Sequence, residues 1–270
     1  MTITPAACLE IAVAAARAAG GHARDQRHRR GEAHQLLAHD VKLALDVECQ
    51  GIAEKILRAR APGHAILGEE SVGAAETADA DTPLWIVDPI DGTVNFSHGL
   101  PFWCCSIGVR LGTRTLAGAV YAPDMDELYT ATADGPALCN GAPLHVSSVA
   151  AVSEALIMTG LDKQVDPRLP PFEIFRAISV QAQKARIVGT AALDLCRVAA
   201  GQADAYFESG IYVWDIAAAA LIVERAGGRT ELLGELGHGR LRFLASNGLI
   251  HEAVRNIIGR VPQEKTQAEG

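Results

Sequence analysis

The segment WIVDPIDGTVNF, residues 85–96, constrains this chain more than any other part of its sequence. It begins with apolar, β-prone residues at 85–87, which predict a short buried strand. Asp88 ends that strand, and Pro89 disfavours a regular strand or helix across the following turn. Asp91 comes three residues after Asp88. We therefore expect a buried strand that delivers two carboxylates to one rigid turn.

Two carboxylates on a rigid turn can hold a hard cation. Mg²⁺ prefers oxygen ligands in octahedral geometry and takes only some of them from protein, which leaves positions for water and phosphate. Gly92 and Thr93 follow at once, and their backbone N–H groups can bind an anion beside the cation. A lone Asp-Gly pair is usually a turn or a helix cap, but this combination favours a metal site.

The same segment, from Asp88 to Phe96, resembles the signature of the inositol monophosphatase family, the Mg²⁺-dependent, Li⁺-sensitive phosphatases. Further segments match that family in the same order: GEES at 68–71, VGTAAL at 188–193, and WDIAA at 214–218 with AGG ending at 228. The resemblance extends over residues 11–258. It implies an alternating αβαβα layered sandwich of the sugar-phosphatase type, usually assembled as a homodimer.

The length of 270 residues is sufficient for a substantial core, and we expect one domain with two subdomains. Residues 1–149 form an α+β subdomain that carries the main metal site, since their later strands follow one another with short links, as in an antiparallel meander. Residues 150–270 form an α/β subdomain that completes the metal and substrate site, since their strands and helices alternate.

Hydrophobic periodicity and turn residues divide the chain into expected elements. Helices are expected at residues 5–24, 46–61, 171–182, 191–200, 214–226 and 249–258. Extended segments or strands are expected at residues 36–45, 65–67, 85–87, 103–111, 115–121, 127–132, 137–138, 156–158, 185–188, 203–208 and 242–245. Residues 71–83 are expected to form a surface loop and residues 261–270 a polar tail.

Composition and charge narrow the class of protein. A formal net charge of −8 argues against binding to a nucleic-acid polymer, although bound metal ions can still make a phosphate site. The six cysteines show no CxxC spacing, which argues against a zinc site or a thioredoxin-like motif. No secretory signal and no apolar run of membrane-spanning length are visible. We expect a cytoplasmic protein without a membrane partner.

Residues 22–30 are basic. We interpret this run as a solvated helix end or loop, with an electropositive rim that attracts phosphate as the alternative.

Carboxylates occur at three separate places, each beside a predicted strand end or helix start, so they can meet at one sheet edge. The resemblance implies that Glu69 and Asp88, with the carbonyl of Ile90, hold one Mg²⁺. It implies that Asp88, Asp91 and Asp215 hold a second, and that a third, weaker ion lies near Glu69. Asp215 also starts an apolar helix, so it can cap that helix and bind metal at once.

The expected catalytic residues are Thr93, Asp46 and Glu69. Thr93 is the candidate for orienting the attacking water, and Asp46 resembles the family Asp that pairs with that Thr in a general-base relay. The chain departs from the family pattern just before this Asp, where Lys42 and Leu43 replace a common Val-Thr. Lys42 is either a solvated strand residue or a phosphate contact.

The resemblance also implies a substrate-binding surface. Gly189, Thr190 and Ala191 match a family Gly-Thr-Ala that contacts the polyol of the substrate. Glu208 matches a Glu that accepts hydrogen bonds from the hydroxyls of the polyol, and such a carboxylate discriminates strongly against analogues that lack them. The expected substrate-binding set is completed by Gly92, Thr93 and Asp215.

Together these features predict a Mg²⁺-dependent phosphomonoesterase that hydrolyses a small phosphorylated polyol, foremost myo-inositol monophosphate. A metal-activated water attacks phosphorus in line. Alternatives within the same chemistry are histidinol phosphate, a nucleotide 3′-phosphate and fructose 1,6-bisphosphate. An alternative of another class is a metal-dependent sugar-phosphate binding protein without turnover.

Overall fold

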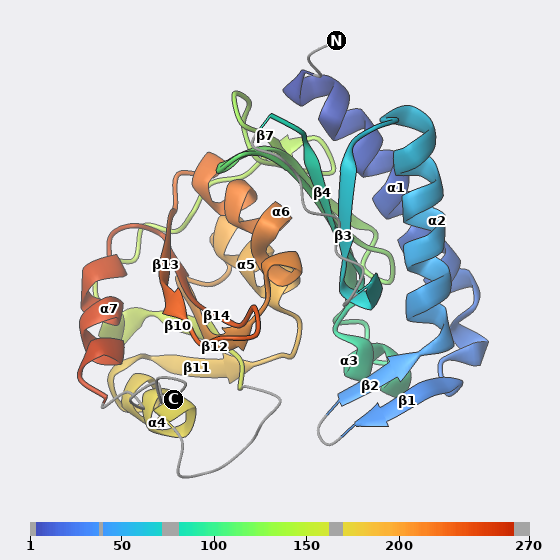
Figure 1. Ribbon diagram of the computed structural model, residues 1–270. Helices are drawn as coiled ribbons and strands as arrows, with labels where there is room; N and C mark the ends of the chain where they lie inside the picture. Colours follow the sequence, from blue (N-terminus) through green and yellow to red (C-terminus); the bar gives the residue numbers. More distant parts are fainter. Residues whose placement is uncertain (1–3, 38–39, 72–80, 162–169, 262–270) are drawn as a thin grey trace, which may run out of the picture.

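The computed structural model describes residues 4–37, 40–71, 81–161 and 170–261. Five layers alternate between helices and sheets (Figure 1). The helical layers are α1 (Pro5–Asp25) with α2 (Ala44–Arg60), then α5 (Ala191–Ala199) with α6 (Val213–Arg225), and finally α4 (Pro170–Gln181) with α7 (His251–Gly259). A sheet separates each pair of helical layers, so the predicted αβαβα sandwich is confirmed.

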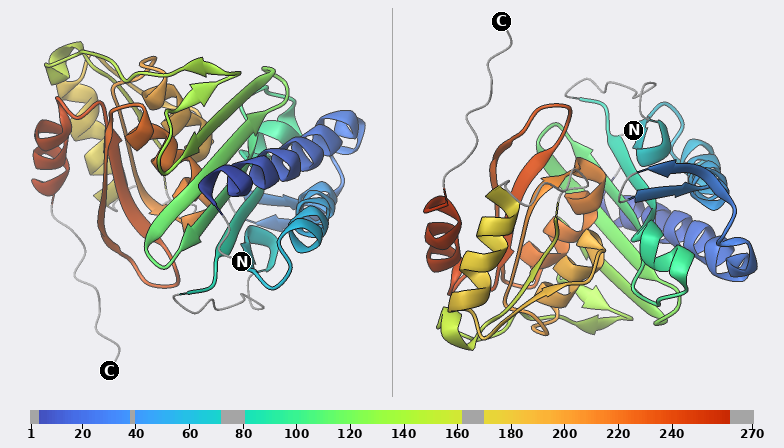
Figure 2. Two further views of the ribbon diagram at one scale, coloured as in Figure 1. Left: turned by 90° about the horizontal axis from the view of Figure 1, so that it is seen from above. Right: turned by 90° about the horizontal axis from the view of Figure 1, so that it is seen from below.

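The first sheet has seven strands in the order β3-β4-β5-β6-β7-β8-β9. Its strands are β3 (Ala65–Gly68), β4 (Leu84–Asp91), β5 (Cys104–Leu111), β6 (Arg114–Ala122), β7 (Glu127–Thr132), β8 (Leu138–Cys139) and β9 (Ala142–Pro143). Strands β3 and β4 run parallel, and every later neighbour is antiparallel, as the short links predict. The long strands β5 and β6 cross behind α1 when the molecule is seen from above (Figure 2).

The second sheet has five strands in the order β11-β10-β12-β14-β13. They are β10 (Leu156–Thr159), β11 (Lys184–Ile187), β12 (Ala205–Ile211), β13 (Arg229–Glu235) and β14 (Leu241–Ser246). Strand β10 is parallel to both of its neighbours, and β14 is antiparallel to β12 and β13. The mixed sheet expected from alternating strands and helices is therefore present.

Strand β4 is buried along its whole length, because helices cover both faces of its sheet. Contrary to the prediction that a regular strand would end before Pro89, β4 continues to Asp91. The prediction was correct that Pro89 interrupts the regular ladder of hydrogen bonds, since the pairing of β4 with β5 shifts register between Asp88 and Asp91. A bulge at this point accommodates a proline that lacks an N–H donor, and bulges redirect the side chains next to them.

The predicted helices are all present, with ends shifted by at most two residues. Helix α1 runs through Gly20 and Gly21. A Cβ atom on Gly20 would lie 3.1 Å from Tyr121, so this glycine allows the helix to lie close to the first sheet.

Three elements were not expected from the sequence, and one of them is β9, which has only two residues. Helix α3 (Thr93–His98) is six residues long and follows a left-handed Gly92, which is too short for a periodic signal. Strand β13 is an edge strand with charged residues along it, a composition typical of edges but weak as a strand signal.

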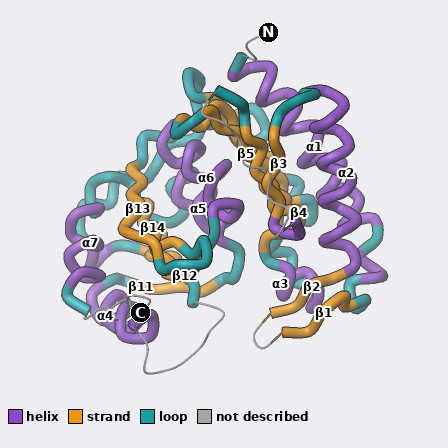
Figure 3. The backbone as a smooth tube through the Cα atoms, viewed as in Figure 1, coloured by secondary structure: helices purple, strands orange, loops and turns teal. Residues whose placement is uncertain are grey.

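The extended segment expected at residues 36–45 is a hairpin of β1 (Ala33–Leu37) and β2 (Asp40–Leu43), and β2 contacts α3 (Figure 3). Most of the predicted loop at 71–83, namely 72–80, and nearly all of the predicted tail lie outside the described residues. No helix among the described residues has the length and apolar character that crossing a membrane requires.

The basic segment at the end of α1 makes ion pairs with α2. Arg29 donates to Glu48 at 2.7 Å, and His22 lies 3.2 Å from the same carboxylate. The interpretation as a solvated helix end agrees with these exposed contacts, which tie α1 to α2.

Helix α6 packs unusually close to the first sheet because small residues face each other. A Cβ atom on Gly118 of β6 would lie 2.7 Å from the carbonyl oxygen of Ala218, and one on Gly108 would lie 3.0 Å from the Cβ of Ala217. Real Cβ contacts are not this short, so any larger residue would push α6 away. This close packing fixes the position of the helix that carries Asp215.

We expect Gly118→Ala to destabilise the protein by about 1–3 kcal/mol, because the new methyl group overpacks the contact between β6 and α6. Urea denaturation measures the change. Gly51→Ala is the matched control: Gly51 is exposed in α2 with no atom near its missing Cβ, so we expect about 0.4–1 kcal/mol of stabilisation. Equal stability of Gly118→Ala and the wild type would contradict the close packing.

Candidate active site

A cavity of about 320 Å³ opens where residues of both sheets meet. Every predicted metal-binding and substrate-binding residue lines it: Glu69, Asp88, Ile90, Asp91, Gly92, Thr93, Gly189, Thr190, Ala191, Glu208 and Asp215. The predicted catalytic residue Asp46 is buried but is not among the lining residues. Segments that lie far apart in the sequence therefore supply a single cavity.

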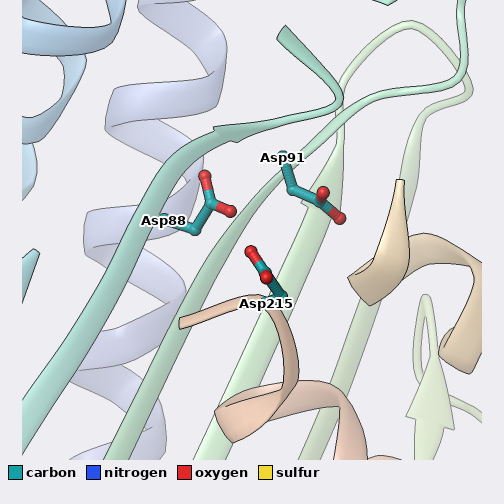
Figure 4. A group of neighbouring side chains, drawn as sticks. All are labelled: Asp88, Asp91 and Asp215. Carbon is teal, nitrogen blue, oxygen red and sulfur yellow. The ribbon is translucent and has the colours of Figure 1, made fainter. Parts of the chain in front are cut away.

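Three carboxylates form the most compact acidic group among the described residues. Asp88, Asp91 and Asp215 each offer one oxygen, and these oxygens all lie within 4.8 Å of one another. Figure 4 shows the carboxylates of Asp88 and Asp215 facing each other. Asp91 lies beside them and belongs to β4, the same strand as Asp88. The bulge in β4 and the start of α6 bring the three groups together.

Asp91 is held in place by the start of α5. Its Oδ2 accepts hydrogen bonds from the hydroxyl of Thr190 and the backbone N–H of Ala192, both at 2.7 Å. Its Oδ1 accepts a longer bond, 3.3 Å, from the N–H of Ala191. The positive end of a helix stabilises a carboxylate at this position. Thr190 and Ala191, predicted to contact substrate, thus use these donors on Asp91.

Asp215 and Asp46 occupy equivalent positions in their helices. Each is the third helical residue, and each accepts a hydrogen bond from the N–H of the residue before the helix: Tyr212 at 2.7 Å and Leu43 at 2.6 Å. Asp215 therefore caps its helix from the third position rather than from the N-cap. One oxygen of each carboxylate is fixed by the backbone, which orients the other.

Burial raises the pKa of all three clustered carboxyls, and repulsion by neighbouring carboxylates adds to the increase for Asp88 and Asp215. For Asp88 the causes are burial, then the charges of Glu69 and Asp91, and for Asp215 they are burial, then Asp91 and Glu69. For Asp91 burial also raises the pKa, although its hydrogen bonds oppose the shift. Such shifts mark functional sites more often than structural ones.

The residues that line the cavity include no lysine and no arginine. The chain therefore brings no cation of its own to this cluster within the described residues. Three closely spaced, buried oxygen donors are the ligand type that hard divalent cations prefer. The residues present fit a divalent metal ion, with Asp88, Asp91 and Asp215 as its donors.

Glu69 follows β3 in a short 3₁₀ turn, Glu69–Ser71, and faces the same cavity. Gln50 of α2 holds this turn: its amide oxygen accepts from the N–H of Glu70 at 2.9 Å, and its amide nitrogen donates to the hydroxyl of Ser71 at 2.5 Å. Lys42 forms an ion pair with Glu70 at 3.1 Å. Lys42 was expected to be either a solvated strand residue or a phosphate contact. The structure shows neither, because this ion pair connects the β1–β2 hairpin to the turn.

The hydrogen bond expected between Thr93 and Asp46 is not formed. The Thr93 hydroxyl donates to the carbonyl of Ile90 at 2.9 Å instead. Oδ1 of Asp46 has no hydrogen-bond partner among the described residues, and Oδ2 is committed to Leu43. Burial chiefly raises the pKa of Asp46, to about 8, with further increases from Glu70 and Glu69. The general-base role of this pair stays a prediction.

Glu208 faces the cavity from β12, and the hydroxyl of Tyr206 donates to its carboxylate. Gly160 lies against it: a Cβ there would be 2.1 Å from Oε2 of Glu208. Sequence reasoning missed Gly160 and also Asp194, which lines the cavity from the first turn of α5. The available signal was spacing, because Asp194 is one helical turn beyond Ala191.

Cys104 and Arg110 have the Cys-x5-Arg spacing of cysteine phosphatases. Both lie along the extended strand β5, and Cys104 is fully buried behind Asp91, with Sγ 3.7 Å from Oδ2. Burial also raises the pKa of this thiol. The strand geometry cannot form a loop around a phosphate, which argues against a cysteine nucleophile.

Comparison with known proteins extends over nearly the whole chain. The sequence profile of the inositol monophosphatase family matches residues 5–265. Inositol monophosphatase 1 of Bos taurus is 41% identical over 193 residues, which cover 70% of each chain. The solved structure of inositol monophosphatase from Anabaena (Nostoc) has a TM-score of 0.81 at 32% identity and covers 95% of this chain and 96% of that one. The solved structure of SuhB from Mycobacterium tuberculosis has a TM-score of 0.82 at 32% identity and covers 98% of this chain and 100% of that one.

We expect Asp88→Asn to raise the thermal stability of the metal-free protein by about 1–2 kcal/mol, because it removes one of three crowded buried charges. The same variant should lose most of the stabilisation that millimolar Mg²⁺ gives the wild type. Differential scanning calorimetry with and without Mg²⁺ measures both changes. Asp134→Asn, at an exposed carboxylate, is the control and should leave both values unchanged. A full Mg²⁺ response in Asp88→Asn would rule out this metal site.

We expect the metal-free protein to lose stability as the pH rises from about 4 to about 8. The folded pKa of Asp46 is about 8, whereas an unfolded Asp titrates near its ordinary value of about 4. In this window the folded state holds a proton that the unfolded state has lost, so increasing pH favours unfolding. Thermal melting at three pH values tests this, and Asp46→Asn should show a shallower decline. An identical slope in the variant would contradict the assignment.

Proposed function

Because the chain belongs to the inositol monophosphatase family, we propose that it is a Mg²⁺-dependent phosphomonoesterase acting on a small phosphorylated polyol, foremost myo-inositol monophosphate. The observation that carries this proposal is the buried trio of carboxylates in a cavity whose lining offers no basic side chain. A phosphate dianion cannot enter such a cavity unless cations come with it. Binding and chemistry therefore both depend on metal.

Asp88, Asp91 and Asp215 are the proposed donors of the central ion, and Glu69 with Asp88 and the carbonyl of Ile90 are the proposed donors of another. When bound, Mg²⁺ supplies positive charge to the phosphoryl oxygens and lowers the pKa of a coordinated water. The hydrogen bonds from α5 to Asp91 support this assignment, because they fix one ligand before any ion arrives.

Thr93 is the proposed residue that orients the attacking water, with Asp46 as its proton acceptor. The Oδ1 atom of Asp46 is buried and without a partner among the described residues, so it is free to receive such a bond. The backbone N–H groups of Gly92 and Thr93 are the proposed contacts of the phosphate. Glu208 is the proposed acceptor for a substrate hydroxyl.

Gly189, Thr190 and Ala191 are the proposed contacts of the polyol, together with Asp215. All four line the same cavity as Glu208, which supports this assignment. The hydroxyl of Thr190 and the N–H of Ala191 already donate to Asp91. Their proposed contact with the substrate is therefore through carbon atoms, and their small side chains leave room for the polyol.

We further propose that the protein acts in the cytoplasm and, as the family resemblance implies, that it is a homodimer inhibited by Li⁺. All six cysteines are free thiols, which supports a reducing compartment.

We expect phosphate release to be fastest, by kcat/KM, from myo-inositol 1-phosphate in a panel that also contains histidinol phosphate, a nucleotide 3′-phosphate and fructose 1,6-bisphosphate. Asp215→Asn should lower kcat by about a hundredfold or more, because it removes a proposed metal donor while keeping the acceptor for the N–H of Tyr212. Asp134→Asn should behave as the wild type.

This substrate panel distinguishes the proposed function from the alternative substrates and from a binding protein without turnover. Preference for another ester would change the substrate and leave the chemistry intact. Mg²⁺-dependent binding of these esters without phosphate release would identify a binding protein, and wild-type turnover by Asp215→Asn would exclude the proposed site.

A further inference from the structure

Asp194 is a buried carboxyl group that none of the predicted roles uses. It lies in the first turn of α5, faces the cavity, and its relative exposure is only 2%. Among the described residues, its carboxyl oxygens take part in no hydrogen bond and no ion pair, whereas its backbone N–H donates to the carbonyl of Thr190 at 3.0 Å. An acidic side chain of this kind normally has several partners when it is buried.

The surroundings of Asp194 do not compensate its charge. Asp91 and Glu208 both repel it electrostatically, and burial together with these charges raises its pKa. The nearest cation that acts on it, Arg197, donates instead to Glu127 at 2.7 Å and to the hydroxyl of Tyr129 at 2.7 Å. Neither oxygen of Asp194 is among the fully buried atoms that lack a partner, so the carboxyl reaches the cavity, where solvent or a ligand is its available partner.

Glu208 and Asp194 belong to the same wall of the cavity, built from α5 and the second sheet. Glu208 already accepts a bond from Tyr206, and Gly160 provides the space that its carboxylate occupies. The wall therefore presents two carboxyl groups to the cavity: Glu208, which bonds Tyr206, and Asp194. The proposed acidic ligands for metal come from other elements: β4, the turn after β3 and the start of α6.

We propose that Asp194 binds a second hydroxyl of the substrate, beside the hydroxyl bound by Glu208. This inference rests on the proposed function. The substrate class that fits is a phosphate ester of a polyol with at least two free hydroxyls. A hydroxyl can donate to an ionised carboxylate and can accept from a protonated one, so it satisfies Asp194 in either state. An ammonium group would need the ionised form, which burial and two neighbouring acids disfavour.

The test compares Asp194→Ala and Asp194→Asn with two substrates, myo-inositol 1-phosphate and 4-nitrophenyl phosphate, which has no free hydroxyl. In Asp194→Ala we expect KM for the inositol ester to rise about 10- to 100-fold, with little change in kcat. Asp194→Asn should change that KM less than about threefold, because its amide can still bond a hydroxyl. KM for 4-nitrophenyl phosphate should not change in either variant.

Thermal melting separates this role from a structural one. Removing a buried carboxyl that Asp91 and Glu208 repel should leave the melting temperature of Asp194→Ala equal or higher, and its Mg²⁺-dependent shift should stay as in the wild type. A marked loss of melting temperature in Asp194→Asn would instead show that Asp194 supports the fold, and would overturn the inference. Asp134→Ala, at an exposed carboxylate, is the matched control.

The outcomes distinguish this inference from the proposed function. Turnover of inositol phosphate with an unchanged KM in Asp194→Ala would overturn the inference alone. If the wild type releases no phosphate, calorimetric binding of inositol 1-phosphate decides: weaker binding to Asp194→Ala supports the inference without the activity, and equal or no binding overturns it. If histidinol phosphate is preferred and both variants impair it equally, Asp194 binds an ammonium group and the hydroxyl assignment is wrong.

Discussion

The structure depends on one electrostatic constraint, the gathering of three buried carboxylates within 4.8 Å of one another. Like charges at this separation repel strongly in a poorly solvated site, and the cavity lining brings no basic side chain to offset them. The surrounding fold must therefore be rigid enough to hold groups that would otherwise separate. A site of this kind is incomplete without a cation, which is why metal dependence follows from the architecture as well as from the family.

The rigidity comes from the middle of the sandwich. Helix α6 packs against Gly108 and Gly118 so closely that a single methyl group would displace it. The start of α5 donates two short hydrogen bonds to Asp91, and the bulge in β4 places Asp88 and Asp91 on the same side. Each ligand is thus held by an element whose own position is fixed by packing, which is the arrangement that preorganised sites require.

The two sides of the cavity carry different sets of polar groups. The first sheet, with Asp88 and Asp91, provides oxygen donors suited to a cation and its phosphate. The wall with Glu208 and Asp194 provides groups suited to hydroxyls. Both sides place several acidic groups close together inside the protein, and such crowding lowers the stability of the metal-free fold. Under the proposed function, changes at the second wall would alter substrate choice and leave the metal donors of the first side intact.

The sequence by itself determined most of the order of the elements, because strand and helix periodicity are local patterns. Its motifs, foremost the DPIDGT segment, resemble the inositol monophosphatase family, and that resemblance implied the layered class and the residues of the main acidic site. It did not determine the path of β4 through Pro89, the use of Thr190 on Asp91, the partner of Thr93 or the exposure of Asp194 to the cavity. Those features depend on which segments meet across the two sheets. Contacts between residues about one hundred positions apart, such as Thr190 with Asp91, leave no local pattern, so only the tertiary structure decided them.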